Sequence, residues 1–298
     1  MADANATVAR SRPRRNNYAL VIAYDFAYSN GSLFHSQKSN NMELNLKGRT
    51  ALITGGSRGI GYGVAQALAA EGCNLHLASR SAANLETARK TLVDAHHVSV
   101  TTYALDLSRL ENTVKLAQAC GSVDILINNA GAIPQGSITG LDDKTWREAW
   151  DLKLFGFINL TREIYRDMCE KKRGVIVNVT GTAGERPTAN YIAGSMANAA
   201  LMAMSRALGA ESVDYGVRVV ALNPGSIETD RQVVRWKARA KKELGDENRW
   251  RELTTGFPRG RLGRVDEVAD MIVFLCSDRS GYTSGTVITI DGGASSRK

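Results

Sequence analysis

The stretch that decides the fold is Thr54-Gly55-Gly56-Ser57-Arg58-Gly59-Ile60-Gly61, residues 54–61 of the chain. It follows the aliphatic run Ala51–Thr54 and opens a segment with helical spacing of apolar residues. Glycines at such a turn leave room for a tight backbone and for the close approach of a phosphate, and the helix N-terminus that follows attracts an anion. The stretch therefore predicts a strand–turn–helix unit that binds a nucleotide.

Outward from this turn, short β-branched and aliphatic runs alternate with longer amphipathic segments. This alternation is typical of βαβ units with a sheet buried on both faces. We predict an α/β fold: a single Rossmann-type doubly wound domain with a seven-stranded, mostly parallel sheet flanked by helices. The predicted strands are Ala51–Thr54, Asn74–Ser79, Val98–Ala104, Asp124–Asn128, Val175–Val179, Arg218–Asn223 and Val287–Asp291. The predicted helices are Gly61–Glu71, Ala82–Ala95, Ser108–Ala119, Lys144–Glu170, Gly194–Ser212 and Val265–Ser277.

The composition indicates a folded globular chain, because 43% of its 298 residues are hydrophobic and 23% are charged. We expect residues 42–298 to form one dinucleotide-binding catalytic domain. Within it, the charged segment 230–260, which carries Trp236 and Trp250, predicts a mobile helical lid. The net charge of +8 is dispersed along the chain, which favours an anionic ligand or a solvated surface over nucleic acid.

The cysteines and histidines argue against disulfides and metals. No CxxC pair occurs, and the four histidines lack metal-ligand spacing. The best apolar run, Tyr18–Tyr28, is far shorter than the ~20 residues that span a bilayer and is broken by Asp25. We therefore expect a reduced, cytoplasmic, metal-free protein with no membrane partner. Its four cysteines are Cys73, Cys120, Cys169 and Cys276.

Residues 1–41 are open to three interpretations. We interpret them as a disordered N-terminal extension. Their arginines before the run Tyr18–Tyr28 also fit a transit peptide or a poor signal peptide. Alternatively Met42 is the natural start, because the segment Met42–Arg49 leads directly into the first predicted strand.

Four further motifs follow predicted strands in order. They are Asp106-Leu107 after the third strand, Asn128-Asn129-Ala130-Gly131 after the fourth, Asn223-Pro224-Gly225 after the sixth and Asp291-Gly292-Gly293 at the seventh. Together with the TGxxxGxG pattern of residues 54–61, they make the chain resemble the short-chain dehydrogenase/reductase family, from about Lys47 to Gly293.

The resemblance implies a dinucleotide site along the strand ends. Asp106 would contact the adenine, Asn129–Gly131 would line the adenosine ribose, and the segment after the sixth strand would position the nicotinamide amide. The resemblance also implies a homodimer or homotetramer that acts on a small-molecule substrate. The expected cofactor-binding residues are Gly55, Ser57, Arg58, Gly59, Ile60, Gly61, Ser79, Arg80, Asp106, Leu107, Asn129, Ala130, Gly131, Pro224, Gly225, Ile227 and Thr229.

The end of the second predicted strand favours NADP(H) over NAD(H). An acidic residue there would accept the ribose 2′-hydroxyl and repel a 2′-phosphate, but the strand ends in Ser79 followed by Arg80. Arg80 and Arg58 can flank the phosphate with two cationic donors, and Ser79 adds a hydroxyl. We therefore predict NADP(H) as the cofactor.

The catalytic pattern that the family resemblance implies is missing. The family uses a tyrosine as general acid/base, a lysine four residues later, a serine about thirteen residues earlier and an asparagine on the preceding long helix. In the ungapped register these positions hold Gly194, Asn198, Gly181 and Lys153, respectively. The chain is thus an atypical member of the family it resembles.

Two side chains can restore the chemistry. Tyr191 lies three residues before the vacant tyrosine position, and Lys153 has a stem long enough to bring an ammonium into the vacated space. A nearby ammonium lowers the pKa of a tyrosine, as a proton donor at neutral pH requires. Thr180 or Thr182 would replace the serine hydroxyl, and we select Thr182. Sliding the register onto Tyr191 instead places Ser195 and Asn178 at the lysine and serine positions and still requires Lys153.

Three functions stay open. The leading one is an NADP(H)-dependent oxidoreductase that transfers hydride between nicotinamide and a carbonyl or alcohol carbon, with Tyr191 and Lys153 as a relocated pair. The second is a non-catalytic NADP(H)-binding sensor or assembly partner, in which Tyr191 is a packed aromatic and Lys153 a helix-surface cation. The third is reduction of an activated carbon–carbon double bond, which needs no tyrosine acid.

Overall fold

The computed structural model describes residues 42–297, and residues 43 onward form one compact unit. The interpretations of residues 1–41 lie outside this range. A seven-stranded sheet runs through the unit in the order β3-β2-β1-β4-β5-β6-β7, and every pairing between neighbours is parallel. The chain reverses its direction of travel across the sheet between β1 and β4, where doubly wound folds bind their ligands. The strands are β1 (Thr50–Thr54), β2 (Asn74–Ser79), β3 (Val100–Ala104), β4 (Ile125–Asn128), β5 (Gly174–Val179), β6 (Val217–Pro224) and β7 (Val287–Ile290).

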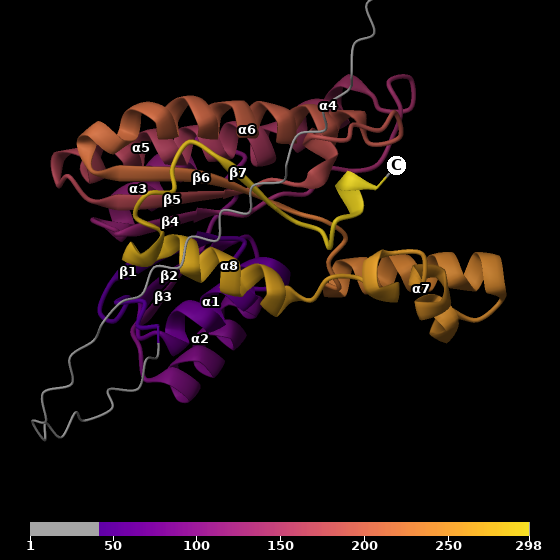
Figure 1. The fold of residues 1–298 in the computed structure, drawn as a ribbon, viewed down its shortest axis with the longest axis horizontal. Coiled ribbons are helices and arrows are strands. Elements are labelled where there is room, and N and C mark those ends of the chain that lie inside the picture. Colours follow the sequence, from indigo (N-terminus) through magenta and orange to yellow (C-terminus); the bar gives the residue numbers. More distant parts are fainter. Residues whose placement is uncertain (1–41, 298) are drawn as a thin grey trace, which may run out of the picture. The chain divides into compact units, whose positions relative to one another are not determined.

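Helices cover both faces of the sheet, as the predicted doubly wound fold requires (Figure 1). On one face lie α1 (Gly59–Ala70), α2 (Ala82–His96) and α8 (Val265–Cys276), which bury Leu68, Leu85 and Ile272 against the strands. On the other face lie α3 (Leu110–Cys120), α5 (Gly156–Glu170) and α6 (Ile192–Glu211), with Leu116 and Leu160 in a second core. The strands β4, β5 and β6 are buried on both sides, which accounts for their continuous apolar runs.

One predicted helix is interrupted. Instead of a single α-helix over 144–170, the chain forms α4 (Asp143–Trp150), a π-helical turn (Asp151–Phe155) and then α5. Gly156 packs so closely at this turn that a Cβ there would lie 2.9 Å from the carbonyl oxygen of Leu107. Single π-turns inside α-helices are frequent at functional sites, and this one holds Lys153.

The segment after β6 folds into its own small helical lobe. It comprises α7 (Asp230–Leu244) and 3-10 turns at Glu247–Thr254 and Pro258–Gly260. Trp250 is buried in this lobe, and Trp236 meets Phe257 edge to face with ring centroids 5.7 Å apart. Figure 1 shows the lobe standing beside the sheet rather than on either of its faces. The segment 230–260 is thus helical in the structure, whereas its role as a mobile lid stays a prediction.

Other sequence expectations can be compared with residues 42–297 alone. All four cysteines lie in this part of the chain and are free. No group of three or more His, Cys, Asp or Glu side chains is arranged there to hold a metal ion. No helix within the same range is long and apolar enough to cross a membrane.

Candidate active site

The predicted cofactor residues gather at one edge of the sheet. Because all strands are parallel, the segments that follow β1, β2, β3, β4 and β6 emerge at the same edge. The glycine stretch follows β1, Asp106 follows β3, Gly131 follows β4 and the segment 225–229 follows β6, while Ser79 ends β2. The structure therefore brings together every strand end from which the sequence predicted a nucleotide contact.

The glycine loop is packed too tightly for side chains. Gly59 has φ +57, in the left-handed region, and begins α1. A Cβ on Gly61 would lie 2.4 Å from the carbonyl oxygen of Gly55, so alanine there would displace backbone. Ser57, Arg58 and Ile60 complete this strand-to-helix turn, whose first-turn amides are free for an anion.

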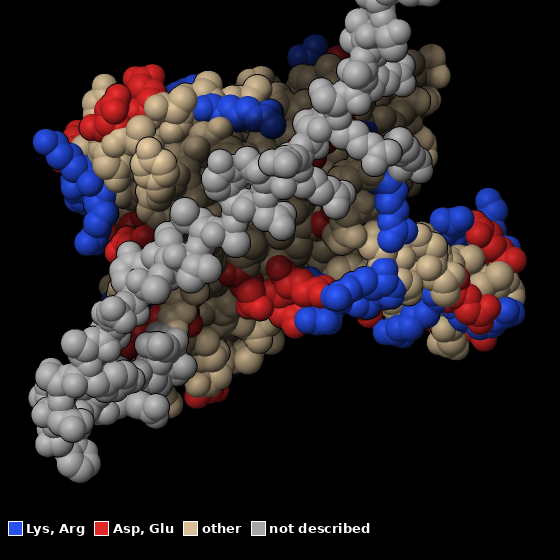
Figure 2. Space-filling model, in the orientation of Figure 1, with Lys and Arg blue, Asp and Glu red and all other residues tan. Residues whose placement is uncertain are grey.

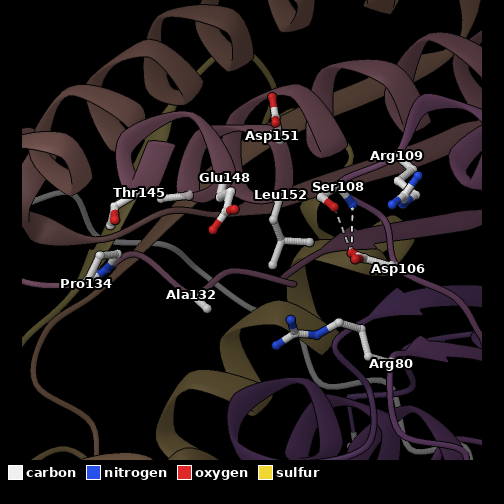
Figure 3. Close-up of a pocket in the computed structure, with 11 residues that line it drawn as sticks. Arg80, Asp106, Ser108, Arg109, Ala132, Pro134, Thr145, Glu148, Asp151 and Leu152 are labelled. Carbon is white, nitrogen blue, oxygen red and sulfur yellow. Dashed lines mark hydrogen bonds between the residues drawn. The ribbon is translucent and has the colours of Figure 1, made fainter. Parts of the chain in front are cut away.

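A cavity of about 550 Å³ opens between the ends of β2, β3 and β4, lined by Arg80 and Asp106. Asp106 accepts hydrogen bonds from the backbone amide of Ser108 at 3.1 Å and from its hydroxyl at 2.9 Å. These bonds fix the Asp106 carboxylate at the wall. Figure 3 shows the Arg80 guanidinium projecting into the cavity from the side opposite α4.

Three of the predicted cofactor residues contact neighbouring loops. Asn129 donates from its side-chain amide to the carbonyl oxygen of Thr54 at 3.0 Å. The backbone amides of Asn129 and Ala130 both donate to the Thr54 hydroxyl, at 2.9 and 3.0 Å. Thr229 lies against the glycine loop, since a Cβ on Gly59 would meet its methyl carbon at 3.4 Å. Asn129 thus joins the ends of β1 and β4 at the point where the chain reverses.

Lys153 is a buried cation at the centre of the site. Its side chain is only 8% exposed, so the helix-surface reading is wrong. The ammonium Nζ donates to the carbonyl oxygen of Val179 at 2.6 Å and lies 4.6 Å from the centroid of the Phe157 ring. The stem passes over Gly131, where a Cβ would be 2.6 Å from the lysine Cδ. Lys153 therefore lies between the ends of β4 and β5.

Burial also changes the proton affinity of Lys153. Desolvation lowers its pKa from the ordinary 10.5 to about 7, because no carboxylate compensates the buried ammonium. The group is thus poised to exchange a proton near neutral pH.

A stability measurement tests this pKa. Between pH ~7 and ~10.5 the unfolded chain keeps the Lys153 proton that the folded chain releases, so stability rises with pH by at most about 1.4 kcal/mol per pH unit. Below this window both states are protonated and the contribution is constant. Lys153→Met removes the titration. We expect urea unfolding at pH 7, 8 and 9 to give a wild-type minus variant difference that grows with pH. A difference independent of pH would contradict the assignment.

Tyr191 occupies the space of the missing catalytic side chain. It precedes α6, and a Cβ on Gly194 would lie 2.1 Å from two carbons of the Tyr191 ring. The ring is therefore seated directly over the position where the family resemblance expects its tyrosine. Two contacts hold the start of α6. Tyr191 forms an isolated parallel β-bridge with Gly136, and Trp150 Nε1 donates to the carbonyl oxygen of Ala193 at 3.0 Å.

The expected electrostatic pairing of Tyr191 with Lys153 is not borne out. No hydrogen bond joins the two side chains among the residues that the structure describes. Burial raises the pKa of Tyr191, and the positive charges that oppose this rise belong to Arg231 and Arg235. The prediction that Lys153 lowers the pKa was wrong in direction, because desolvation outweighs every nearby cation. Tyr191 is a protonated phenol at neutral pH.

Of the polar residues considered for the role of the missing serine, only Thr182 keeps a hydroxyl that is not already bonded within the described residues. Thr180 is unsuited to replace the serine, since its buried hydroxyl donates to the carbonyl oxygen of Leu222 at 3.0 Å and contacts Asn223. Thr182, in the 3-10 turn Thr182–Gly184 after β5, keeps a half-buried side chain without such a bond. Asn178 is fully buried and bonded to Asn128 and Ser205, which excludes the slid register.

The sequence did not indicate that Arg231 and Arg235, near the start of α7, act on Tyr191. The segment 230–260 showed only a high density of charge, without indicating which cations face the site. Thr229 as an N-cap was a usable signal, because its hydroxyl accepts from the amide of Gln232 and fixes where α7 begins.

The parallel sheet, the glycine loop and the ligand cavity at the reversal point define a dinucleotide-binding Rossmann-type protein. Residues 55–295 match the family model described as enoyl-(acyl carrier protein) reductase. The chain therefore belongs to the short-chain dehydrogenase/reductase family. It is an enzyme of the oxidoreductase class, as its relatives are.

Several known proteins are similar over most of their length. The 3-oxoacyl-(acyl-carrier-protein) reductase of Escherichia coli is 32% identical, over 84% of this chain and 98% of its own. The 2-keto-3-deoxy-L-fuconate dehydrogenase of Xanthomonas campestris is also 32% identical, over 83% and 80%. Among solved structures, L-sorbose reductase from Gluconobacter frateurii, complexed with NADPH and L-sorbose, has a TM-score of 0.82 at 29% identity, covering 86% of this chain and all of its own.

Proposed function

We propose that the chain is an NADP(H)-dependent oxidoreductase that transfers hydride between nicotinamide and a carbonyl or alcohol carbon of a small molecule. Tyr191, Lys153 and Thr182 carry the proton and carbonyl chemistry. The observation that carries this proposal is the buried Lys153 ammonium between the ends of β4 and β5, in a site whose usual catalytic positions are vacant.

The end of β2 fits a 2′-phosphate. Ser79 Oγ is buried and has no hydrogen-bond partner among the described residues, so a hydroxyl is unused beside Arg80. Arg80 enters no ion pair in the same range, whereas Arg58 donates to Asn84 at 2.7 Å. The L-sorbose reductase structure was solved with NADPH, as was that of actinorhodin polyketide ketoreductase, at a TM-score of 0.79 and 26% identity. Arg80 and Ser79 would hold the phosphate.

When bound, NADPH supplies the hydride. In the reductive direction Tyr191 donates its phenolic proton to the carbonyl oxygen as the new C–H bond forms, because burial keeps the phenol protonated. The Thr182 hydroxyl polarises the same oxygen. Lys153, which makes no hydrogen bond with Tyr191 among the described residues, would return the proton to Tyr191 through intervening water, since its pKa of about 7 allows exchange near neutral pH.

The chain has exchanged two residues relative to the family pattern. Lys153 stands where the family resemblance expects asparagine, and the buried Asn198 stands where it expects lysine. The side-chain amide nitrogen of Asn198 lies 3.0 Å from where a Cβ on Gly181 would be, so this amide closes the vacated serine position. The exchange supports a site that keeps one lysine and moves it to the other helix.

The seat of the Tyr191 ring is testable. In Gly194→Ala the new methyl group displaces the ring, and misplacing a catalytic group by about 1 Å can cost up to about 10²-fold in rate. We expect kcat to fall at least about tenfold, with little change in Tm because alanine favours the helix by about 1 kcal/mol. Gly256→Ala is the matched control, since no atom lies within 4 Å of its Cβ position. Unchanged kcat in Gly194→Ala would argue against Tyr191.

Cofactor choice is tested at Arg80. Removing the Arg80 guanidinium from the cavity wall should take a charge-assisted donor from the 2′-phosphate and leave the other predicted cofactor contacts in place. We expect Arg80→Ala to raise the Kd for NADPH about 10- to 100-fold and to leave the Kd for NADH within about twofold. Fluorescence titration of both cofactors checks this. An equal loss of affinity for NADPH and NADH would show that Arg80 does not contact the 2′-phosphate.

The function itself is tested by NADPH oxidation with a panel of ketones and aldehydes, and in reverse with alcohols. Turnover with any of them supports the proposal. Tight NADPH binding without turnover across the panel favours the non-catalytic sensor instead. The panel includes activated alkenes, because reduction of a carbon–carbon double bond would proceed without Tyr191.

We also propose a homodimer or homotetramer in the cytoplasm, with the lobe at 230–260 as a lid over the substrate. Sedimentation of the purified chain with and without NADPH tests the assembly.

A further inference from the structure

Two arginines near the start of α7, Arg231 and Arg235, lie close enough for their charges to act on Tyr191. Arg231 Nη1 lies 3.5 Å from the carbonyl oxygen of Gly131, the residue over which the Lys153 stem passes. Arg235 lies one turn further along α7, four residues on, so both side chains project from the same face. Both charges act on Tyr191, where they oppose the effect of burial on its pKa. Arg231 therefore borders the space between Tyr191 and the end of β4, and Arg235 lies one turn further along the same face of α7.

Neither arginine has an acidic partner among the residues that the structure describes. The other basic side chains of the lobe mostly do: Arg239 pairs with Glu243, and Arg249 with Glu252. Arg251 pairs with Glu228 at 3.0 Å. Glu228, the last acidic residue before α7, is therefore engaged by Arg251 and not by Arg231 or Arg235. Figure 2 shows basic and acidic side chains intermixed over this lobe. Arg231 and Arg235 are thus exposed cations left unneutralised at the site.

The spacing of Arg231 and Arg235 on α7 creates an electrostatic repulsion that a bound anion would relieve. Like charges four residues apart on a helix repel each other. An oxyanion bound between them turns this repulsion into two charge-assisted hydrogen bonds, and a planar guanidinium matches the geometry of carboxylate or phosphate. Among the described residues, the charges that act on Tyr191 are both positive, so the local field favours an anion from outside.

We infer that the substrate is a carbonyl compound with an anionic oxyacid group, which Arg231 and Arg235 bind beside Tyr191. The inference rests on the proposed function and names its substrate class. Arg231 and Arg235 orient the substrate through this group, so that its carbonyl oxygen faces the Tyr191 hydroxyl. Lys153 is too deeply buried to bind the same group, being held on the carbonyl oxygen of Val179.

The test compares oxo acids with their neutral methyl esters. The probes are 2-, 3-, 4- and 5-oxohexanoate, each methyl ester, and hydroxyacetone phosphate against hydroxyacetone. With NADPH, we expect at least one anionic probe to exceed its neutral partner at least about tenfold in kcat/KM. Arg231→Gln and Arg235→Gln each remove most of this preference through KM, while the Kd for NADPH is unchanged. The acid and phosphate arms show which oxyanion is preferred.

Lys241→Gln is the matched control. It removes the same charge from an exposed residue of α7 that forms no ion pair with any described residue and lies about 15 Å beyond Arg231 along the helix. It should leave the preference unchanged.

Binding measured by calorimetry with NADP⁺ separates this inference from the proposed function. Anionic probes that bind the wild type and lose affinity in Arg231→Gln uphold the inference, whether or not they are turned over. Binding of these probes without any turnover would count against the proposed function and not against the inference. Turnover that favours the esters, a preference unaffected by both arginine variants, or no binding of any anionic probe would overturn the inference.

Discussion

Lys153→Met should lower kcat/KM by about 10²- to 10⁴-fold, the range expected for loss of a positioned proton-transfer group. Methionine nearly fills the volume of the buried stem over Gly131, so the fold and the cofactor loop should persist. We therefore expect the Kd for NADPH to stay within about twofold of wild type. Steady-state NADPH oxidation with the best substrate of the panel, together with fluorescence titration of NADPH, measures both quantities.

Lys153→Asn provides the sharper comparison. It installs the residue that the family pattern has at this position, but Asn198 still stands at the lysine position. No ammonium then remains at the centre of the site, and we expect the same loss as for methionine. Lys241→Met, which removes an exposed lysine of α7, should retain full turnover. Undiminished turnover in either Lys153 variant would remove Lys153 from the mechanism.

Tyr191→Phe is expected to produce the second large effect. It deletes only the hydroxyl, and the ring keeps its seat over Gly194. We expect kcat to fall about 10²- to 10⁴-fold, because the carbonyl oxygen loses its proton donor. Thermal stability should change little, since no hydrogen bond of the Tyr191 hydroxyl is found among residues 42–297. Rate measurements in both directions and a thermal melt check these expectations.

The pattern of loss distinguishes catalysis from packing. A catalytic hydroxyl lowers kcat with KM and NADPH affinity preserved. If Tyr191 only packs at the start of α6, the phenylalanine variant keeps its kcat. Turnover of an activated alkene by Tyr191→Phe, with loss of ketone reduction, would point to the carbon–carbon reductase alternative.

The sequence predicted the elements of the fold closely where the signal was local. The strand Asn74–Ser79 has the bounds that its apolar run indicated, and α2 begins at Ala82 behind the side-chain cap of Ser81. Alternation of buried strands with amphipathic segments was enough to predict the parallel sheet, because strands covered on both faces need continuous apolar residues. The cofactor edge followed from that topology.

Features that depend on tertiary contacts could not be predicted. The π-turn at Asp151–Phe155 depends on Gly156 packing against the carbonyl oxygen of Leu107, which helical periodicity does not reveal. The burial of Lys153 likewise depends on the bare backbone of Gly131 beneath its stem. The direction of the Tyr191 pKa shift was misjudged because burial was not visible in the sequence.

The structure explains why a glycine stands at the position where the family pattern has its tyrosine. In the sequence, Gly194 is simply a lost tyrosine. In the structure, its missing side chain is the space that the Tyr191 ring fills. The two glycines Gly131 and Gly194 thus leave room for Lys153 and Tyr191, the two side chains proposed to be catalytic.

The most direct test of the relocated pair is a crystal structure of the complex with NADP⁺ and a substrate carbonyl compound or its analogue. The account predicts that the Tyr191 hydroxyl lies within about 3 Å of the substrate oxygen, directly or through one water, and that the Lys153 ammonium faces the same side of the nicotinamide C4. A complex in which both groups point away from the nicotinamide C4 would contradict the account.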